Sequence, residues 1–210
     1  MKIVIAILLS LANAWALAGE VRLNVTGPDG LTGTANLVNK ILEDGTKYVR
    51  LTMKLKHGDG QTTDVLQESS YTDKGVPVRM LQTSKSASKK VSVVVTFTEE
   101  GAQVVMDKGD GPKTNFVVRP DGSTANPTEL WFVKVQPHKG QVVEYYTFRV
   151  SEQTWIKAKS SYKGKTEIVV AGKRVSANLV HMGEVKSYCD DLGDPFRIEL
   201  RDLKLERAAD

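Results

Sequence analysis

Alternation of apolar and polar residues is the feature that most constrains how this chain can fold. In the clearest window Val49, Leu51, Met53 and Leu55 alternate with Arg50, Thr52, Lys54 and Lys56. A period of two puts the apolar side chains on one face of a β-strand and the polar ones on the other. Residues 91–97 and 196–201 show the same pattern. Strands with one wet and one dry face are typical of antiparallel sheets, because parallel strands covered on both sides are apolar throughout.

Glycine-containing turn signals separate these windows at the spacing of consecutive hairpins. They include Asp44-Gly45, Gly58-Asp59-Gly60, Gly109-Asp110-Gly111, Lys163-Gly164 and Gly172-Lys173. Glycine supplies the positive φ that tight hairpin turns require. We therefore predict an all-β protein of about twelve or more strands, in which a large curled antiparallel sheet forms a half-barrel or barrel-like meander with little helix.

Two segments fit the strand pattern less well. In one segment the apolar residues are spaced as on one face of a helix: Ala35, Val38, Ile41 and Leu42. We nevertheless assign this segment as a strand. Near the C-terminus the apolar parity changes between residues 200 and 203, which predicts either a short helical turn or a bulge near Asp202. Nothing in the sequence resembles a linker, so we expect residues 19–210 to form a single antiparallel β domain.

The first 18 residues have the pattern of a secretory signal peptide. Met1-Lys2 precedes an apolar stretch over residues 3–11, and Ala16 and Ala18 suit a small-residue cleavage site before Gly19. An N-terminal anchor that stays uncleaved is the alternative. The apolar stretch is too short to span a bilayer, so we expect a periplasmic or secreted protein rather than an integral membrane protein.

Charge is nearly balanced in this chain of 210 residues, with 29 Lys and Arg against 25 Asp and Glu. The basic residues are spread along the chain, which disfavours nucleic acid as a partner. The densest basic cluster, residues 84–90, could contact anionic lipid headgroups or form a solvated loop tip.

The sequence shows no catalytic constellation. His57 and His138 each fall in a turn, where an exposed histidine is ordinary. His181 and Cys189 form the one pair on neighbouring predicted strands, but no third residue accompanies them. Cys189, the only cysteine, is either a buried small hydrophobic residue or a thiol open to a partner. We predict no catalytic residue and a non-enzymatic protein.

Metal-binding patterns are missing as well, since the chain has no CxxC, HxH or HExxH motif and no complete calcium loop. Asp190, Asp191 and Asp194 make a small acidic segment that either binds calcium weakly or is a simple β-turn. We therefore expect neither a metal site nor a cofactor.

Aromatic residues gather in the second half of the chain. Trp131 and Val133 occupy alternate positions there, as do Tyr146 and Phe148, so each pair would lie on one face of a strand. A curled sheet either packs its concave face shut or leaves an apolar cleft. Such residues belong to the core or line a ligand site, and the candidates for ligand lining are Trp131, Val133, Tyr146, Phe148 and Trp155.

Several segments resemble a known family. They are residues 44–49 (Asp-Gly-Thr-Lys-Tyr-Val), residues 75–79 (Gly-Val-Pro-Val-Arg) and the strand-hairpin-strand of residues 167–180. In these the chain resembles the DUF3108-like group of exported bacterial β domains, related to the β domain that accompanies some transglutaminase-like proteins. The function of the group is unknown. The resemblance implies a curled sheet similar in outline to periplasmic lipoprotein and lipid carriers, with no catalytic motif. This chain lacks the long helices that plug the concave face of those carriers, and it has no transglutaminase portion.

These observations predict an exported, non-enzymatic binding protein that holds a lipid or other apolar ligand in its curved sheet. The alternative is an envelope module that binds another protein through a sheet edge or an exposed apolar patch and carries no small ligand. A third hypothesis is an enzyme built on Cys189 and His181.

Overall fold

The computed structural model describes residues 19–73, 76–120 and 136–209. These residues form fourteen β-strands and contain no α-helix, which confirms the all-β prediction. The strands are β1 (Gly19–Thr26), β2 (Thr32–Ile41), β3 (Lys47–Lys56), β4 (Thr62–Tyr71), β5 (Pro77–Ser86), β6 (Lys90–Phe97), β7 (Gly101–Asp107), β8 (Pro112–Val118), β9 (Val142–Arg149), β10 (Thr154–Val170), β11 (Lys173–Met182), β12 (Val185–Cys189), β13 (Pro195–Leu200) and β14 (Leu203–Arg207).

All fourteen strands belong to one antiparallel sheet, in the order β8-β7-β6-β5-β4-β3-β2-β1-β14-β13-β12-β11-β10-β9. Strands β1 to β8 form one meander and β9 to β14 form a second, as the regular turn signals predict. Pairing of β1 with β14 joins the two meanders, with Leu23 opposite Arg207 and Val25 opposite Leu205. Because the order is linear, β8 and β9 are the two edges of the sheet.

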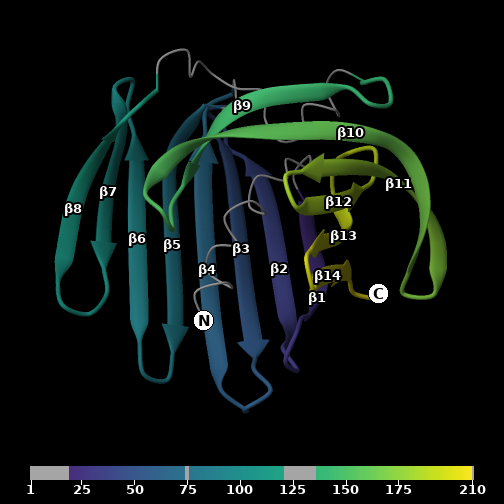
Figure 1. Cartoon of the computed structure of the whole chain (residues 1–210), viewed down its shortest axis with the longest axis horizontal. Helices are drawn as coiled ribbons and strands as arrows, with labels where there is room; N and C mark the ends of the chain where they lie inside the picture. Colours follow the sequence, from purple (N-terminus) through teal and green to yellow (C-terminus); the bar gives the residue numbers. More distant parts are fainter. Residues whose placement is uncertain (1–18, 74–75, 121–135, 210) are drawn as a thin grey trace.

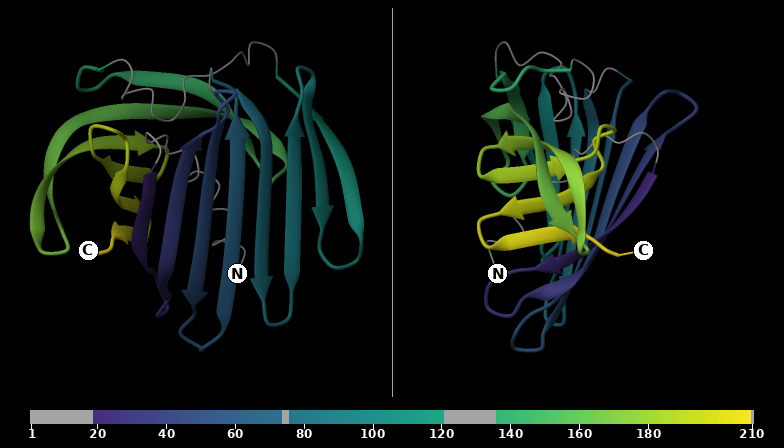
Figure 2. Two further views of the ribbon diagram at one scale, coloured as in Figure 1. Left: turned by 180° about the vertical axis from the view of Figure 1, so that it is seen from behind. Right: turned by 90° about the vertical axis from the view of Figure 1, so that its right-hand side faces the viewer.

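The sheet curls strongly along its length. Strands β2 to β8 stand side by side as a wall, and the β9–β10 hairpin crosses the upper end of that wall (Figure 1). Figure 2 shows the same arrangement from behind and from the side, with β11 to β14 standing beside the wall. Strand β10 contributes to the curl, since it pairs with β9 through Thr154–Ser161 and with β11 from Ser160 onward. A register shift between Tyr162 and Gly164, where φ of Gly164 is +95°, lets this long strand bend.

Burial follows the alternation of the sequence. In β3, Val49, Leu51, Met53 and Leu55 are at most 3% exposed, while the intervening side chains lie on the outer face. Buried apolar residues from both meanders form one main cluster, and Tyr162, Val180 and Cys189 form a smaller one between β10 and β12. We call the face that carries these buried residues the interior face. No helix in the described part of the chain is long and apolar enough to cross a membrane.

The two ambiguous segments resolve in different ways. Residues 32–41 form β2, so the assignment of a strand there is correct. The helical turn and the bulge predicted near Asp202 are both wrong, because the chain reverses there in a two-residue hairpin turn. Leu200 pairs with Leu203, and Arg201 adopts a φ of +49°. The alternation of apolar residues shifts between Leu200 and Leu203 because the chain reverses direction between β13 and β14, and not because a residue is inserted in one strand.

Candidate functional site

The interior face of the first meander is free of charged residues through its central part. Strand register aligns its inward-facing side chains in two rows that run across the sheet from β1 or β2 to β7. One row contains Val21, Leu37, Leu51, Gln67, Gln82, Val93 and Met106, and the next contains Asn39, Val49, Ser69, Met80, Val95 and Val104. In the central part of these strands the basic and acidic side chains lie on the other face, as those of Arg50, Lys54 and Glu68 do.

Four polar side chains interrupt the apolar rows. They are Asn39 in β2, Gln67 and Ser69 in β4, and Gln82 in β5, and each is at most 4% exposed. Gln67 lies opposite Gln82, whereas Val49 separates Asn39 from Ser69. Within the described ranges, Asn39 Oδ1, Asn39 Nδ2, Gln67 Oε1 and Ser69 Oγ have no hydrogen-bond partner. The sequence analysis did not identify these residues. A signal was present, because Gln67 and Ser69 stand two and four residues after Val65 in β4 and therefore point to the same, inward side as Val65.

An aromatic cluster lies where the β9–β10 hairpin packs against β6. The ring centroid of Phe97 in β6 is 5.8 Å from that of Phe148 in β9 and 5.7 Å from that of Trp155 in β10. Phe148 and Trp155 are 5.2 Å apart, and all three pairs have edge-to-face geometry. The guanidinium of Arg119 lies 5.3 Å from the Trp155 ring centroid. This cluster fastens the β9–β10 hairpin onto the wall.

The structure brings together some of the five ligand-lining candidates. Phe148 is 4% exposed, Trp155 packs against the main cluster, and the two are opposite each other in register. Tyr146 is half-buried and lies opposite Lys157. Trp131 and Val133 lie outside the described residues. The described contacts of Phe148 and Trp155 are those of core residues.

Cys189 and His181 do not form a reactive pair. Asn178 is the residue opposite Cys189, so alternation along β11 places His181 on the other face from the thiol. Cys189 Sγ lies 3.0 Å from Ser187 Oγ. Burial raises the pKa of the Cys189 thiol to about 12, which keeps it protonated at neutral pH. Burial and the nearby Lys163 and Lys186 lower the pKa of His181.

The acidic segment at residues 190–194 is a turn held by its own hydrogen bonds. Asp190 Oδ1 accepts hydrogen bonds from the backbone N–H groups of Leu192 and Asp194, at 3.0 and 2.8 Å. Asp191 accepts hydrogen bonds from Asn178 and Lys165. Among the described residues no group of three or more His, Cys, Asp or Glu side chains could hold a metal ion. The geometry of this segment is that of an Asp-rich β-turn.

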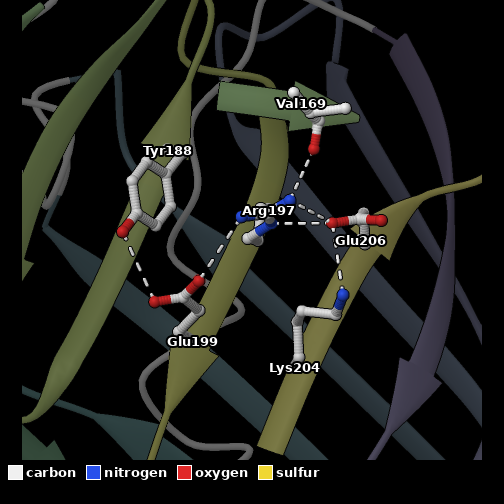
Figure 3. A network of polar contacts seen from close by, with 6 residues as sticks. All are labelled: Val169, Tyr188, Arg197, Glu199, Lys204 and Glu206. Carbon is white, nitrogen blue, oxygen red and sulfur yellow. Dashed lines mark hydrogen bonds and ion pairs between the residues drawn. The ribbon is translucent and has the colours of Figure 1, made fainter. Parts of the chain in front are cut away.

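A polar network ties the second meander together on the outer face (Figure 3). The guanidinium of Arg197 in β13 donates to Glu206 Oε2 at 2.7 Å through Nε and to the backbone carbonyl of Val169 at 2.6 Å. Glu199 lies 3.7 Å from Arg197, and Tyr188 donates to Glu199 at 3.4 Å. The network joins β10, β12, β13 and β14, and we assign it a structural role.

Comparisons with known proteins identify the fold alone. No family model and no curated protein matches the chain. One similar solved structure is the crystal structure of a beta-barrel-like protein of the domain of unknown function DUF1849 from Brucella abortus. It superposes with a TM-score of 0.60 at 11% sequence identity, covering 93% of this chain and 98% of that one. The chain thus shares a barrel-like β architecture with another domain of unknown function.

Proposed function

We propose that the protein is an exported, non-enzymatic binding protein that holds a lipid or other apolar ligand against the interior face of its curled sheet. One observation carries this proposal. A continuous sheet, with no helix among the described residues to cover it, turns charge-free rows of mostly apolar side chains inward from β1 to β7. Binding sites for apolar ligands are concave and lined in this way, with a few polar groups that fix orientation.

Three further features fit this proposal. The signal-peptide pattern of residues 1–18 supports a location in the periplasm or outside the cell, where lipids need carriers to cross water. The resemblance to DUF3108-like domains implies a curled sheet similar to lipid carriers. The barrel-like DUF1849 structure adds a neighbour of the same architectural class. Fold analogy alone does not assign a function, so a direct measurement of binding is required.

Native mass spectrometry tests the proposal. The protein is purified from the envelope of its own host without detergent, then measured before and after organic extraction. We expect a stoichiometric apolar adduct that extraction removes and that added 1-monopalmitoylglycerol restores. A bare protein mass with no uptake of the added lipid would overturn the proposal.

A matched pair of variants tests whether the ligand binds to the interior face. Ala35 is buried at 3% exposure on that face, and Thr34 is exposed on the opposite one. Ala35→Leu adds volume inside the curl and should weaken lipid uptake, whereas Thr34→Leu should leave it unchanged. Equal uptake by both variants would contradict an interior site.

The second candidate is a protein-interaction module, and the edge strand β8 is the observation that favours it. β8 ends the sheet, and Phe116 and Val118 on it are 46% and 72% exposed. An exposed strand edge with apolar side chains can pair with an extended peptide that carries apolar residues at alternate positions. A photo-crosslinker at Thr114 should then capture a partner in the native envelope, while one at the exposed Val169 should not. Phe116→Glu should abolish that crosslink; its persistence would contradict this role for β8.

A further inference from the structure

The buried polar side chains of the first meander form a cluster that the fold alone does not explain. We call Asn39, Gln67 and Ser69 the polar patch. They are 3%, 2% and 1% exposed and lie on adjacent rows of the interior face. Val49, Leu51 and Met80 lie beside them in the same rows, although Gln82 is the other neighbour of Gln67. The sheet therefore accommodates apolar residues readily at this depth.

The polar patch destabilises the folded chain as it stands. Four of its atoms lack a hydrogen-bond partner among the described residues: Asn39 Oδ1 and Nδ2, Gln67 Oε1 and Ser69 Oγ. Leaving a buried polar group unpaired costs folding free energy, and native proteins do so only rarely. Several such atoms on one small part of an apolar wall indicate a site where a bound molecule supplies the partners.

The unpaired atoms define the chemistry of that molecule. The patch offers two carbonyl acceptors, one amide donor and one hydroxyl that can both donate and accept. The two rows that contain it carry no charged side chain, and an ionic group there would be buried without a counter-charge. A matching head group is uncharged and both donates and accepts hydrogen bonds.

We propose that the polar patch binds the head group of a neutral, hydroxyl-bearing acyl lipid, whose acyl chain lies along the apolar rows. This inference rests on the proposed lipid-binding function and adds the class of ligand and the residues that select it. Asn39 and Ser69 face the head group from either side of Val49, and Gln67 lies two residues before Ser69 on the same strand. A carboxylate or phosphate head group would be excluded by the cost of burying its charge.

Two lipids of the same acyl length separate head-group recognition from chain binding. 1-Monopalmitoylglycerol carries two hydroxyls, whereas methyl palmitate has an ester but no donor. We expect the wild-type protein to bind the glycerol ester at least about tenfold more tightly, which corresponds to the loss of roughly one buried hydrogen bond. Palmitate, which is ionised, should bind more weakly than the glycerol ester.

The triple variant Asn39→Leu/Gln67→Leu/Ser69→Ala tests the assignment. It should stay folded, because replacing unpaired buried polar groups by apolar ones of similar size is neutral or stabilising. We expect it to lose the preference for monopalmitoylglycerol while its affinity for methyl palmitate stays unchanged. Asn24→Leu, an exposed change on the outer face of β1, is the control and should keep the wild-type preference.

The outcomes distinguish this inference from the function on which it rests. If both lipids bind the wild type and the triple variant equally well, the polar patch does not select the head group, although lipid binding stands. If neither lipid binds the wild type, both the proposed function and the inference fail. Tighter binding of palmitate than of the glycerol ester would also overturn the inference, because it would require a buried cation.

Discussion

Arg197 in β13 donates a hydrogen bond of 2.6 Å to the backbone carbonyl of Val169, near the tip of the β10–β11 hairpin. The same guanidinium pairs with Glu206 in β14. Beyond Ser161 the long β10 leaves β9 and pairs with β11 alone, and this contact ties the far end of that hairpin to β13. Charge-assisted hydrogen bonds of this kind are roughly twice as strong as neutral ones.

We predict that Arg197→Ala lowers the free energy of unfolding by about 1–3 kcal/mol, because Glu199 and Glu206 lose their shared cation. Urea denaturation measures the loss. Arg174→Ala is the control, since that side chain is 82% exposed and its ion pair is 4.0 Å long. Hydrogen exchange should show faster exchange in β10 and β11 for Arg197→Ala only. Equal stabilities of the two variants would contradict the structural role of the network.

The aromatic cluster gives a second prediction. Phe148→Ala should lower the free energy of unfolding by about 3–5 kcal/mol, because a buried ring packed against Phe97 and Trp155 is lost. The same truncation at Phe116, which is 46% exposed, should cost less than about 1 kcal/mol. A loss at Phe148 as small as that at Phe116 would identify Phe148 as a ligand-lining residue rather than a core residue.

The strands and most turns could be predicted because their causes are local. Alternation around Leu51 and the glycine turns that follow most strands of the first meander are visible within ten residues. The pairing of β1 with β14 could not be predicted. Leu23 and Arg207 are far apart in the sequence, and no local pattern around either residue indicates which strand it pairs with. The turn at Arg201 was missed since arginine has no preference for a positive φ.

The polar patch shows why a site can escape sequence reasoning. A polar residue in a strand predicts a solvent-facing position, and Gln67 breaks that rule because its neighbours across the sheet bury it. Register between strands decides that Gln67, Ser69 and Asn39 lie near one another, and register depends on the hairpin turns. Phe148 and Trp155 were both candidates, but their pairing was not predicted, because the turn between them at residues 150–153 contains no glycine.

The thiol of Cys189 should react slowly in the native protein. Its pKa is raised to about 12 by burial, so the thiolate fraction at pH 8 is about a thousandfold below that of a free cysteine. Labelling with Ellman's reagent should need denaturant. Ser187→Ala should leave this result unchanged, because the partner hydroxyl contributes less than burial. Rapid labelling of the native protein would contradict this prediction and would favour the hypothesis of an enzyme built on Cys189 and His181.

Two of the aspartates in the 190–194 turn, Asp191 and Asp194, should respond to pH in opposite ways. Burial and the nearby Asp190 raise the pKa of Asp194, so its ionisation weakens the folded state as pH rises through the folded pKa. Hydrogen bonds from Lys165 and Asn178 lower the pKa of Asp191, whose stabilising effect is present above its unfolded pKa. The stabilisation from the Asp191 carboxylate is lost as pH falls through the pKa that Asp191 has in the folded protein.

Thermal unfolding of two isosteric variants tests these signs. Asp194→Asn should raise Tm at pH 7, and the gain should vanish below the ordinary aspartate pKa. Asp191→Asn should lower Tm slightly at pH 7, because its carboxylate is largely exposed, and this loss should also shrink in acid. The same sign for both variants at pH 7 would contradict the electrostatic account.

The β10–β11 turn offers a stabilising substitution. Ala171 and Gly172 form a two-residue hairpin turn with φ of +48° and +77°, between the paired residues Val170 and Lys173. This is the region that a type I′ turn requires, and alanine adopts it at a cost of about 1 kcal/mol, whereas asparagine tolerates it. Ala171→Asn should therefore raise the free energy of unfolding by about 0.5–1 kcal/mol, and Ala171→Val should lower it. Ala209→Asn, an exposed change beyond β14, is the control and should have no effect in urea denaturation. A destabilised Ala171→Asn variant would show that the side chain of Ala171, rather than its backbone conformation, governs this turn.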